Sequence, residues 1–290
     1  MSIVNLFSLP WGPSSDKFTS MGRVILFVMV TLMVAGCAPY STQLMPGDTT
    51  RPELLEELEM AERMVKEHPT DAKAQLSLAV ALARLGRLEE ALNAHRKALR
   101  LNPDDPTSLA KFGMALVEAG RPMEALTQFE KAVEIAPQDA LARVQLALTY
   151  EQLGRFDEAE AQFKGAMELM PEDSFIHLDL ALLYSRMGRM EEAQRELIKA
   201  VELDPHNTIA RNNLALILAR QGRVAEAIGQ LERILASDPT DALTRVNLAD
   251  LYILTGRSQE AIAQLEHVMR VEPGLRGVKD RLKRLKEKAP

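Results

Sequence analysis

The sequence has 290 residues, of which 47% are hydrophobic, 4% are aromatic and only one is cysteine, and its formal net charge at pH 7 is −6. A single cysteine excludes an internal disulfide, and mild acidity gives no reason to expect nucleic-acid binding, which needs a basic stripe. The composition therefore indicates a soluble helical body, to which shorter segments are attached.

The segment that ends at Cys37 has the features of a secretion signal. A short basic start at residues 21–23 is followed by an uncharged apolar run from Val24 to Val34. This run is shorter than the roughly 20 residues that a membrane-spanning helix needs, and its length is typical of a signal-peptide core. We therefore predict a signal peptide over residues 1–36.

The four residues from Val34 to Cys37 (VAGC) resemble the lipobox of bacterial lipoproteins. The resemblance implies that Cys37 becomes the lipid-bearing first residue of the mature chain. Ala38 follows, and in bacteria with two membranes this resembles the sorting pattern for an outer-membrane lipoprotein that faces the periplasm. The alternative is an uncleaved anchor in which Cys37 is incidental.

The segments on either side of this signal have different compositions. Residues 1–20 are too long and too mixed for an ordinary basic start, so we expect translation to begin at Met21; a long signal peptide is the alternative. Residues 37–51 contain Pro, Gly, Ser and Thr without periodicity and are predicted to be a flexible tether. The fourteen residues after Cys37 span at most about 45 Å when fully extended.

Residues 52–71 contain one amphipathic helix, over residues 52–67, with Pro52 in its first turn. Its end is in phase with the pattern that follows. We interpret it as the second half of a degenerate repeat, whose polar outer face caps a helical array.

From residue 72 to residue 275 the sequence repeats every 34 residues. A Gly-Arg pair recurs without insertion from Gly86-Arg87 to Gly256-Arg257, and a proline recurs at the same step from Pro69 to Pro273. A fixed period of this length indicates small units stacked in a line. We count six full units between residues 72 and 275.

Each unit reads as two amphipathic helices. In the third unit, apolar residues follow helical spacing over residues 144–150 and again over residues 156–167. The glycine between them can end the first helix in a left-handed conformation, and the proline ends the second helix. Two residues after that proline, an Asp or Asn is placed to cap the next helix. We number positions in a unit from the residue after this Asp or Asn.

The units resemble the tetratricopeptide repeat, through Leu146-Ala147-x2-Tyr150 and Ala159-x3-Phe163 followed by proline. The resemblance implies an all-α solenoid of helix-turn-helix repeats that forms a right-handed superhelix. One position departs from the family pattern, since polar or aliphatic residues replace the expected tryptophan, and we expect thinner outer packing there. The residues at this position, position 4, are Gln75, Leu109, Arg143, His177, Arg211 and Arg245.

The resemblance also implies that positions 2, 5, 9, 12 and 13 of the first helices face a concave groove that binds a partner protein. These positions are apolar in the middle units and become polar, together with their neighbours, in the last two. The alternative is that the apolar residues pack between neighbouring units. The predicted groove residues are Met114, Leu141, Val144, Leu148, Phe175, Leu178, Leu182, Ile209, Asn212, Asn213, Leu216, Asn247 and Asp250.

Catalytic and metal-binding motifs are missing from the pattern. The five histidines are far apart in the sequence, and there is neither a glycine-rich phosphate loop nor a nucleophile elbow. Arg87 and its five copies are expected to pair with nearby glutamates. Position 5 never carries the lysine that chaperone-tail clamps of this fold use. We therefore predict neither an enzyme, nor a cofactor, nor such a clamp.

Residues 276–290 are predicted to form a basic C-terminal capping helix. Val278, Leu282 and Leu285 lie on one stripe among many Lys and Arg residues. The alternative is a basic patch for an anionic partner or for lipid head groups.

Together these features predict a non-catalytic, lipid-anchored scaffold for assembly of an envelope machine such as a pilus, a secretion system or a polysaccharide exporter. Lipoproteins that deliver the secretin of type IV pili resemble it in combining a lipobox with such repeats. One alternative is an accessory subunit or regulator of an envelope enzyme such as a cell-wall hydrolase. Another is an uncleaved, membrane-anchored adaptor in the cytoplasm. Repeats alone do not identify the partner or the oligomeric state.

Overall fold

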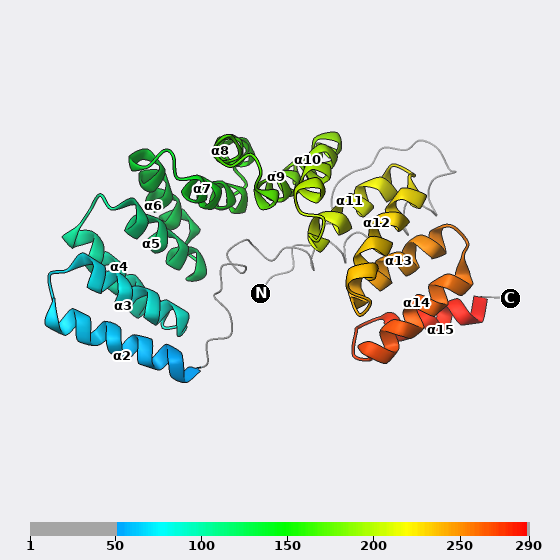
Figure 1. Cartoon of the computed structure of the whole chain (residues 1–290), viewed down its shortest axis with the longest axis horizontal. Coiled ribbons are helices and arrows are strands. Elements are labelled where there is room, and N and C mark those ends of the chain that lie inside the picture. Colours follow the sequence, from blue (N-terminus) through cyan, green and yellow to red (C-terminus); the bar gives the residue numbers. More distant parts are fainter. Residues whose placement is uncertain (1–50, 289–290) are drawn as a thin grey trace, which may run out of the picture. The chain divides into compact units, whose positions relative to one another are not determined.

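The computed structural model describes residues 51–288, which form fourteen helices and no strand. The predicted signal peptide, Cys37 and the tether up to residue 50 lie outside the described residues. In Figure 1 the helices follow one another in chain order from α2 to α15. Their bounds are α2 Arg51–Glu67, α3 Ala72–Arg84, α4 Leu88–Leu101, α5 Pro106–Glu118, α6 Pro122–Ile135, α7 Ala140–Gln152, α8 Phe156–Leu169, α9 Ser174–Arg186, α10 Met190–Leu203, α11 Thr208–Arg220, α12 Val224–Ser237, α13 Ala242–Leu254, α14 Ser258–Val271 and α15 Val278–Lys288.

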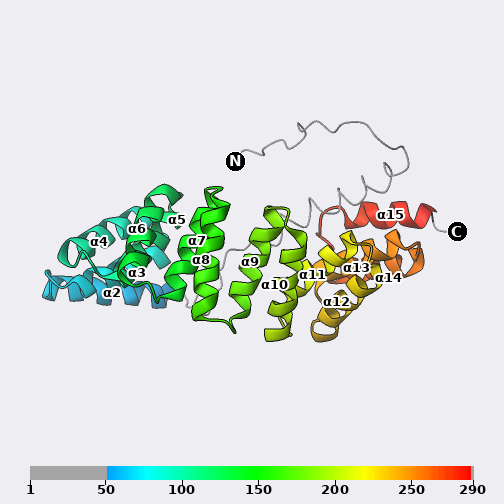
Figure 2. The same ribbon diagram turned by 90° about the horizontal axis from the view of Figure 1, so that it is seen from above.

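The helices pack as six pairs, from α3 with α4 to α13 with α14. Each second helix also packs against the first helix of the next pair, and α5 touches both α3 and α7 directly. The pairs therefore stack in sequence order, as Figure 2 shows from another direction. This arrangement confirms the prediction of an all-α array of tandem helical repeats. None of the helices between residues 51 and 288 is long and apolar enough to cross a membrane.

The ends of the helices follow from the turn and cap residues of each unit. The six predicted glycines between the paired helices have positive φ angles, of 72 to 78°, which a glycine adopts at little cost. After Gly86, for example, the backbone N–H of Arg87 donates to the carbonyl of Leu82 at 2.9 Å and so closes the end of α3. The side chain of the predicted Asp or Asn accepts a backbone N–H in the first turn of all six first helices.

Small residues set the distance between the paired helices. The six alanines that share one position on the second helices, from Ala91 to Ala261, have no exposed surface. In the second unit Gly113 takes the place of alanine on the first helix, because a Cβ there would lie 2.7 Å from the ring of Phe129. The interior is thus packed to contact at every unit, with no room for larger side chains at these positions.

Position 4 carries a polar bridge in place of the tryptophan of the family pattern. Arg211 donates from Nε to the carbonyl of Pro205 at 2.8 Å and from Nη1 to Oε1 of Gln230 at 2.9 Å. The same two contacts, to the proline six residues earlier and to a side chain 19 residues later, recur at Arg143, His177 and Arg245. The polar residue therefore joins the inter-repeat turn to the second helix, which the expectation of thinner packing did not foresee.

This bridge gives a direct test of stability. Arg211 is only 8% exposed, so Arg211→Ala leaves the carbonyl of Pro205 and the amide of Gln230 without their partner. We expect the free energy of unfolding to fall by about 1–3 kcal/mol, measured by denaturant titration. Arg223→Ala, which removes an exposed i, i+3 ion pair with Glu226, is the matched control and should cost no more than about 1 kcal/mol. Equal losses for the two variants would contradict the structural role of the bridge.

Candidate partner-binding surface

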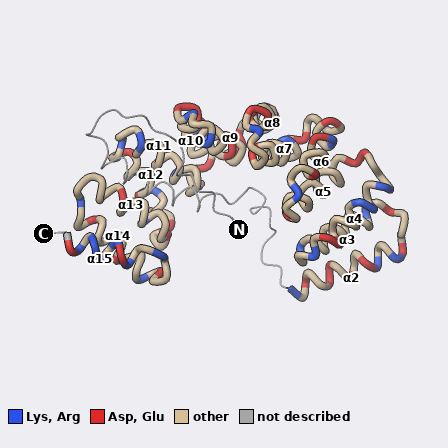
Figure 3. Tube along the Cα trace, turned by 180° about the vertical axis from the view of Figure 1, so that it is seen from behind, with Lys and Arg blue, Asp and Glu red and all other residues tan. Residues whose placement is uncertain are grey.

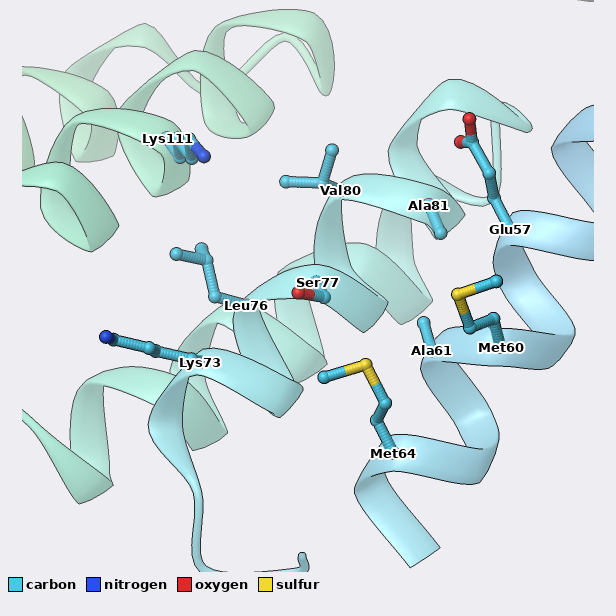
Figure 4. Close-up of a pocket in the computed structure, with 10 residues that line it drawn as sticks. All are labelled: Glu57, Met60, Ala61, Met64, Lys73, Leu76, Ser77, Val80, Ala81 and Lys111. Carbon is cyan, nitrogen blue, oxygen red and sulfur yellow. The ribbon is translucent and has the colours of Figure 1, made fainter.

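A pocket of about 370 Å³ opens between α2, α3 and α5 (Figure 4). From α3 it is lined by Lys73, Leu76, Ser77 and Val80, which occupy positions 2, 5, 6 and 9 of the first unit. Positions 2, 5 and 9 are among those that the family resemblance assigned to a groove, and the structure adds position 6. We call the residues at positions 2, 5, 6 and 9 of α3, α5, α7, α9, α11 and α13 the first-helix surface.

The opposite wall of the pocket comes from α2, which the sequence analysis treated only as a cap. Met60 and Met64 project from α2 toward α3, while Lys111 of α5 lies on the side away from α2 (Figure 4). The signal for this wall was present in the sequence, since two methionines four residues apart share one face of a helix. Met60 is 62% exposed, and such flexible thioether side chains adapt well to a bound apolar group.

In the middle units the predicted apolar residues differ in exposure. Leu141 is 47% exposed. The half-buried residues are Met114, Leu148, Phe175, Leu182, Ile209 and Leu216.

Two predicted groove residues at position 5 are corrected by the structure. Val144 is 1% exposed and Leu178 is 4% exposed, and both belong to the continuous apolar core. Their side chains lie on the part of the helix that packs against its neighbours, so a partner cannot reach them. The alternative of packing between units therefore holds at these two residues.

The polar residues predicted in the last two units mostly satisfy one another. Asn247, which is buried, donates to Oδ1 of Asn212 at 3.2 Å, and Asn212 donates to Oγ1 of Thr244 at 3.3 Å. Asn213 donates to the carbonyl of Ile209 at 2.9 Å within its own helix. Asn212 and Asn247 thus link α11 to α13, which leaves their donors less free for a partner than the sequence suggested, while the buried Oδ1 of Asn247 has no hydrogen-bond partner.

The carboxylate of Asp250 on α13 is paired with the guanidinium of Arg281, which projects from α15. Burial raises the pKa of Asp250 to about 6, and Arg281 opposes this rise. The stripe predicted on α15 is confirmed, since Val278 is buried and Leu282 and Leu285 pack against the core. The last helix thus places both an apolar stripe and a cation on the end of the array.

Asp179, at position 6 of α9, was missed by the sequence analysis, which considered this position only in the last two units, at Asn213 and Asn247. Its Oδ2 atom is buried and has no hydrogen-bond partner, although the residue keeps part of its surface open. The pKa of Asp179 is raised to about 8, mainly by burial and also by the negative charges of Glu151 and Asp173. Glu151 itself is paired with Arg186, with 3.3 Å between Oε1 and Nε.

The arginine that recurs after each glycine has a structural role, as predicted. Each of the six pairs with the glutamate three residues later, at N–O distances between 2.6 and 2.9 Å. Arg155, Arg189 and Arg257 also lie over the rings of Tyr150, Tyr184 and Tyr252 (4.5, 4.3 and 4.2 Å to the centroid). Acidic and basic residues are interspersed along the helices (Figure 3). No group of three or more His, Cys, Asp or Glu side chains between residues 51 and 288 could hold a metal ion.

Comparison with protein-family models finds the tetratricopeptide repeat along nearly all of the array. Models with this description match residues 70–138, 116–174, 178–242 and 218–286. Comparison with curated proteins finds no match.

Several solved structures share this fold. YrrB, described as a TPR protein with an unusual peptide-binding site, is 23% identical with a TM-score of 0.54, covering 66% of this chain and 99% of YrrB. PilF of Pseudomonas aeruginosa is 18% identical with a TM-score of 0.62, covering 73% and 97%. The C-terminal part of a TPR repeat-containing protein of Cytophaga hutchinsonii is 16% identical with a TM-score of 0.63, covering 79% and 94%. At these identities the similarity shows the fold alone.

The pKa of Asp179 predicts a particular dependence of stability on pH. Because the pKa is raised in the folded state, the folded chain keeps a proton that the unfolded chain loses, and stability falls as pH rises from about 4 to about 8. Asp179→Asn removes this loss. We expect the variant to match the parent near pH 4 and to exceed it by at least about 1 kcal/mol at pH 8, in denaturant titrations at both pH values.

The exposed carboxylate of Glu168, on α8, supplies the control for this measurement. Glu168→Gln should leave the difference from the parent nearly the same at both pH values. A constant difference for Asp179→Asn as well would show that Asp179 is not held in a raised-pKa environment.

Proposed function

Because the chain belongs to the tetratricopeptide repeat family, whose members act in general as scaffolds for protein interactions, we propose that it is a non-catalytic adaptor that binds a segment of a partner protein on its first-helix surface. The observation that carries this proposal is the pocket beside α3. It is formed by positions 2, 5, 6 and 9 of the first repeat, and the exposed Leu141 continues the apolar part of this surface in the third repeat.

The dimensions and chemistry of the pocket suit a protein segment. A volume of about 370 Å³ is at the lower end of ligand sites, which measure about 300–1,000 Å³, and accommodates one or two large apolar side chains. Leu76, Val80, Met60 and Met64 supply apolar contacts. A segment anchored there would continue along neighbouring first helices, because these helices lie side by side in the stack.

Site-specific photocross-linking tests this assignment. We expect p-benzoylphenylalanine in place of Val80 or Leu141 to yield a discrete cross-linked species in living cells, because both positions lie on the first-helix surface. Met123, which is 63% exposed but lies on the second helix α6, is the matched control and should give none. Equal cross-linking from Met123, or none from Val80 and Leu141, would overturn the proposed binding surface.

The proposed location is the cell envelope, with attachment through a lipid on Cys37. This part of the proposal rests on the sequence: the apolar run from Val24, the lipobox-like residues before Cys37, and the tether that follows. In a host with two membranes the protein would be an outer-membrane lipoprotein facing the periplasm. There it would hold its partner during assembly of an envelope machine such as a pilus, a secretion system or a polysaccharide exporter.

Substitution of Cys37 separates anchoring from folding. We expect Cys37→Ala to abolish labelling by a fatty acid and to release the protein from the membrane fraction. The melting temperature of the helical array should not change, because Cys37 precedes the first described helix by 14 residues. Unchanged labelling and unchanged fractionation would show that the protein is not a lipoprotein.

A further inference from the structure

A column of polar side chains follows position 6 from one repeat to the next. The pocket shows that this position faces the first-helix surface, because Ser77 and Lys111 line it. Arg281 of α15 continues the column at the same 34-residue step. The members of the column are Ser77, Lys111, Gln145, Asp179, Asn213, Asn247 and Arg281.

Asp179 is the one carboxyl group in this column, and no cation beside it compensates its ionised form. Asn213 and Asn247 donate hydrogen bonds within the array, and Arg281 pairs with Asp250. Asp179 has a buried Oδ2 without a partner; the buried Oδ1 of Asn247 also lacks one, but an amide oxygen carries no charge that needs a cation. An unpaired buried carboxylate is unfavourable for the fold, so packing alone does not explain the residue.

Elsewhere in the chain a carboxylate at a comparable place, Asp250, does have a cation beside it. Asp250, at position 9 of the sixth repeat, forms an ion pair with the guanidinium of Arg281. Arg281 lies on α15, 31 residues further on. Asp179 is at position 6 of α9, as Arg281 is of α15. The residue that corresponds to Asp250 is therefore Leu148, at position 9 of α7 and also 31 residues away. Leu148 offers no charge, so the equivalent of the Asp250–Arg281 pair is missing at Asp179.

We propose that Asp179 binds the side chain of an arginine or lysine in the partner segment, and that apolar residues beside this cation contact Leu148 and Leu182. The inference rests on the proposed function and names the chemistry of its partner: a basic residue flanked by apolar ones. Leu182 lies one turn after Asp179 on the same face of α9, and Leu148 lies on α7. Both are half-buried, so each keeps some surface for contact.

The charges around Asp179 favour a cationic side chain over other occupants. Glu151 of α7 and Asp173 at the start of α9 add negative potential, and Arg186, the basic residue at the end of α9, is paired with Glu151. An anionic segment would be repelled by these charges, and a neutral one would supply no countercharge to the ionised carboxylate. A bare metal ion would need several oxygen ligands, and the part of the chain that the structure describes has no group of three such residues.

Peptide selection tests this proposal on the full chain in detergent. A phage-displayed library of random dodecapeptides is selected in parallel on the parent, on Asp179→Asn and on the control Glu168→Gln. We expect the parent and the control to enrich peptides with one fixed Arg or Lys between apolar residues. Asp179→Asn should enrich apolar peptides without the fixed basic position.

A titration of the best parent peptide gives the quantitative result. Replacement of its basic residue by neutral citrulline or norleucine should weaken binding to the parent at least about tenfold and should change binding to Asp179→Asn much less. Binding to the parent should also release a proton near neutral pH, seen by calorimetry in buffers of different ionisation enthalpy, because a cation favours the ionised carboxylate. Asp179→Asn should show no such release.

The outcomes separate this inference from the scaffold proposal. A fixed basic position that persists on Asp179→Asn, or parent-selected apolar peptides without one, would overturn the cation site and leave the scaffold standing. Failure to enrich any peptide on the parent, together with no cross-link from Val80 or Leu141, would overturn both. Should Asp179→Asn lose helicity, Asp179→Leu, which also removes the carboxyl group, takes its place.

Discussion

The close approach of two helices at a fully buried alanine is the constraint on which the rest of the structure depends. Ala159 and its five counterparts on the second helices have no exposed surface, and the first helices carry Ala or Gly at the position where Gly113 faces the ring of Phe129. A larger side chain at either position would push the helices apart, since a packed interior has no space to absorb it. Because each repeat packs on the next, a pair of helices pushed apart in one repeat would no longer fit against its neighbours. Each repeat therefore has to keep these positions small.

Once the pair is held together, the stack uses the two helices for different purposes. The second helices pack against two first helices each, and this packing joins one repeat to the next. Their starts carry the Arg–Glu pairs, which are exposed and therefore add little to stability individually. The first helices place positions 2, 5, 6 and 9 toward the surface that α2 closes at one end and α15 extends at the other, except that Val144 and Leu178 at position 5 are buried in the core.

Three polar side chains, those of Arg211, Asp250 and Asp179, differ in whether the fold supplies a partner for them. Arg211 is buried, and its donors meet a proline carbonyl and a glutamine amide, so desolvation is offset by hydrogen bonds. Asp250 has a side chain that is only 9% exposed, and it pairs with Arg281. Asp179 has neither kind of partner, and its raised pKa is the physical consequence. A charge that the fold does not satisfy is where a partner can contribute binding free energy.

The sequence by itself determined the fold, because each signal that sets it is local and recurs every 34 residues: the glycine that ends α3, the Asp71 cap, and the alanine contact at Ala91. Agreement between these local signals leaves few alternative arrangements. The features that could not be predicted depend on distances between residues far apart in the chain. Val144 has the same helical phase as exposed neighbours, and only the packing of adjacent helices decides that it is buried.

The candidate site was likewise predictable from the sequence only where its features depend on local position in the repeat. Leu141 was predicted from its position in the repeat, and its exposure agrees with that. The pocket beside α3 requires knowing that α2 returns against it, and the polar bridge of Arg211 requires Gln230 to lie across the pair. The lack of a cation beside Asp179 also depends on the tertiary structure, since it depends on which side chains all the neighbouring elements bring close to the carboxyl group. The local signals that recur in each repeat determine the course of the backbone. The burial of a side chain and the pairing of its charge depend on which residues from distant parts of the chain come together when the repeats stack.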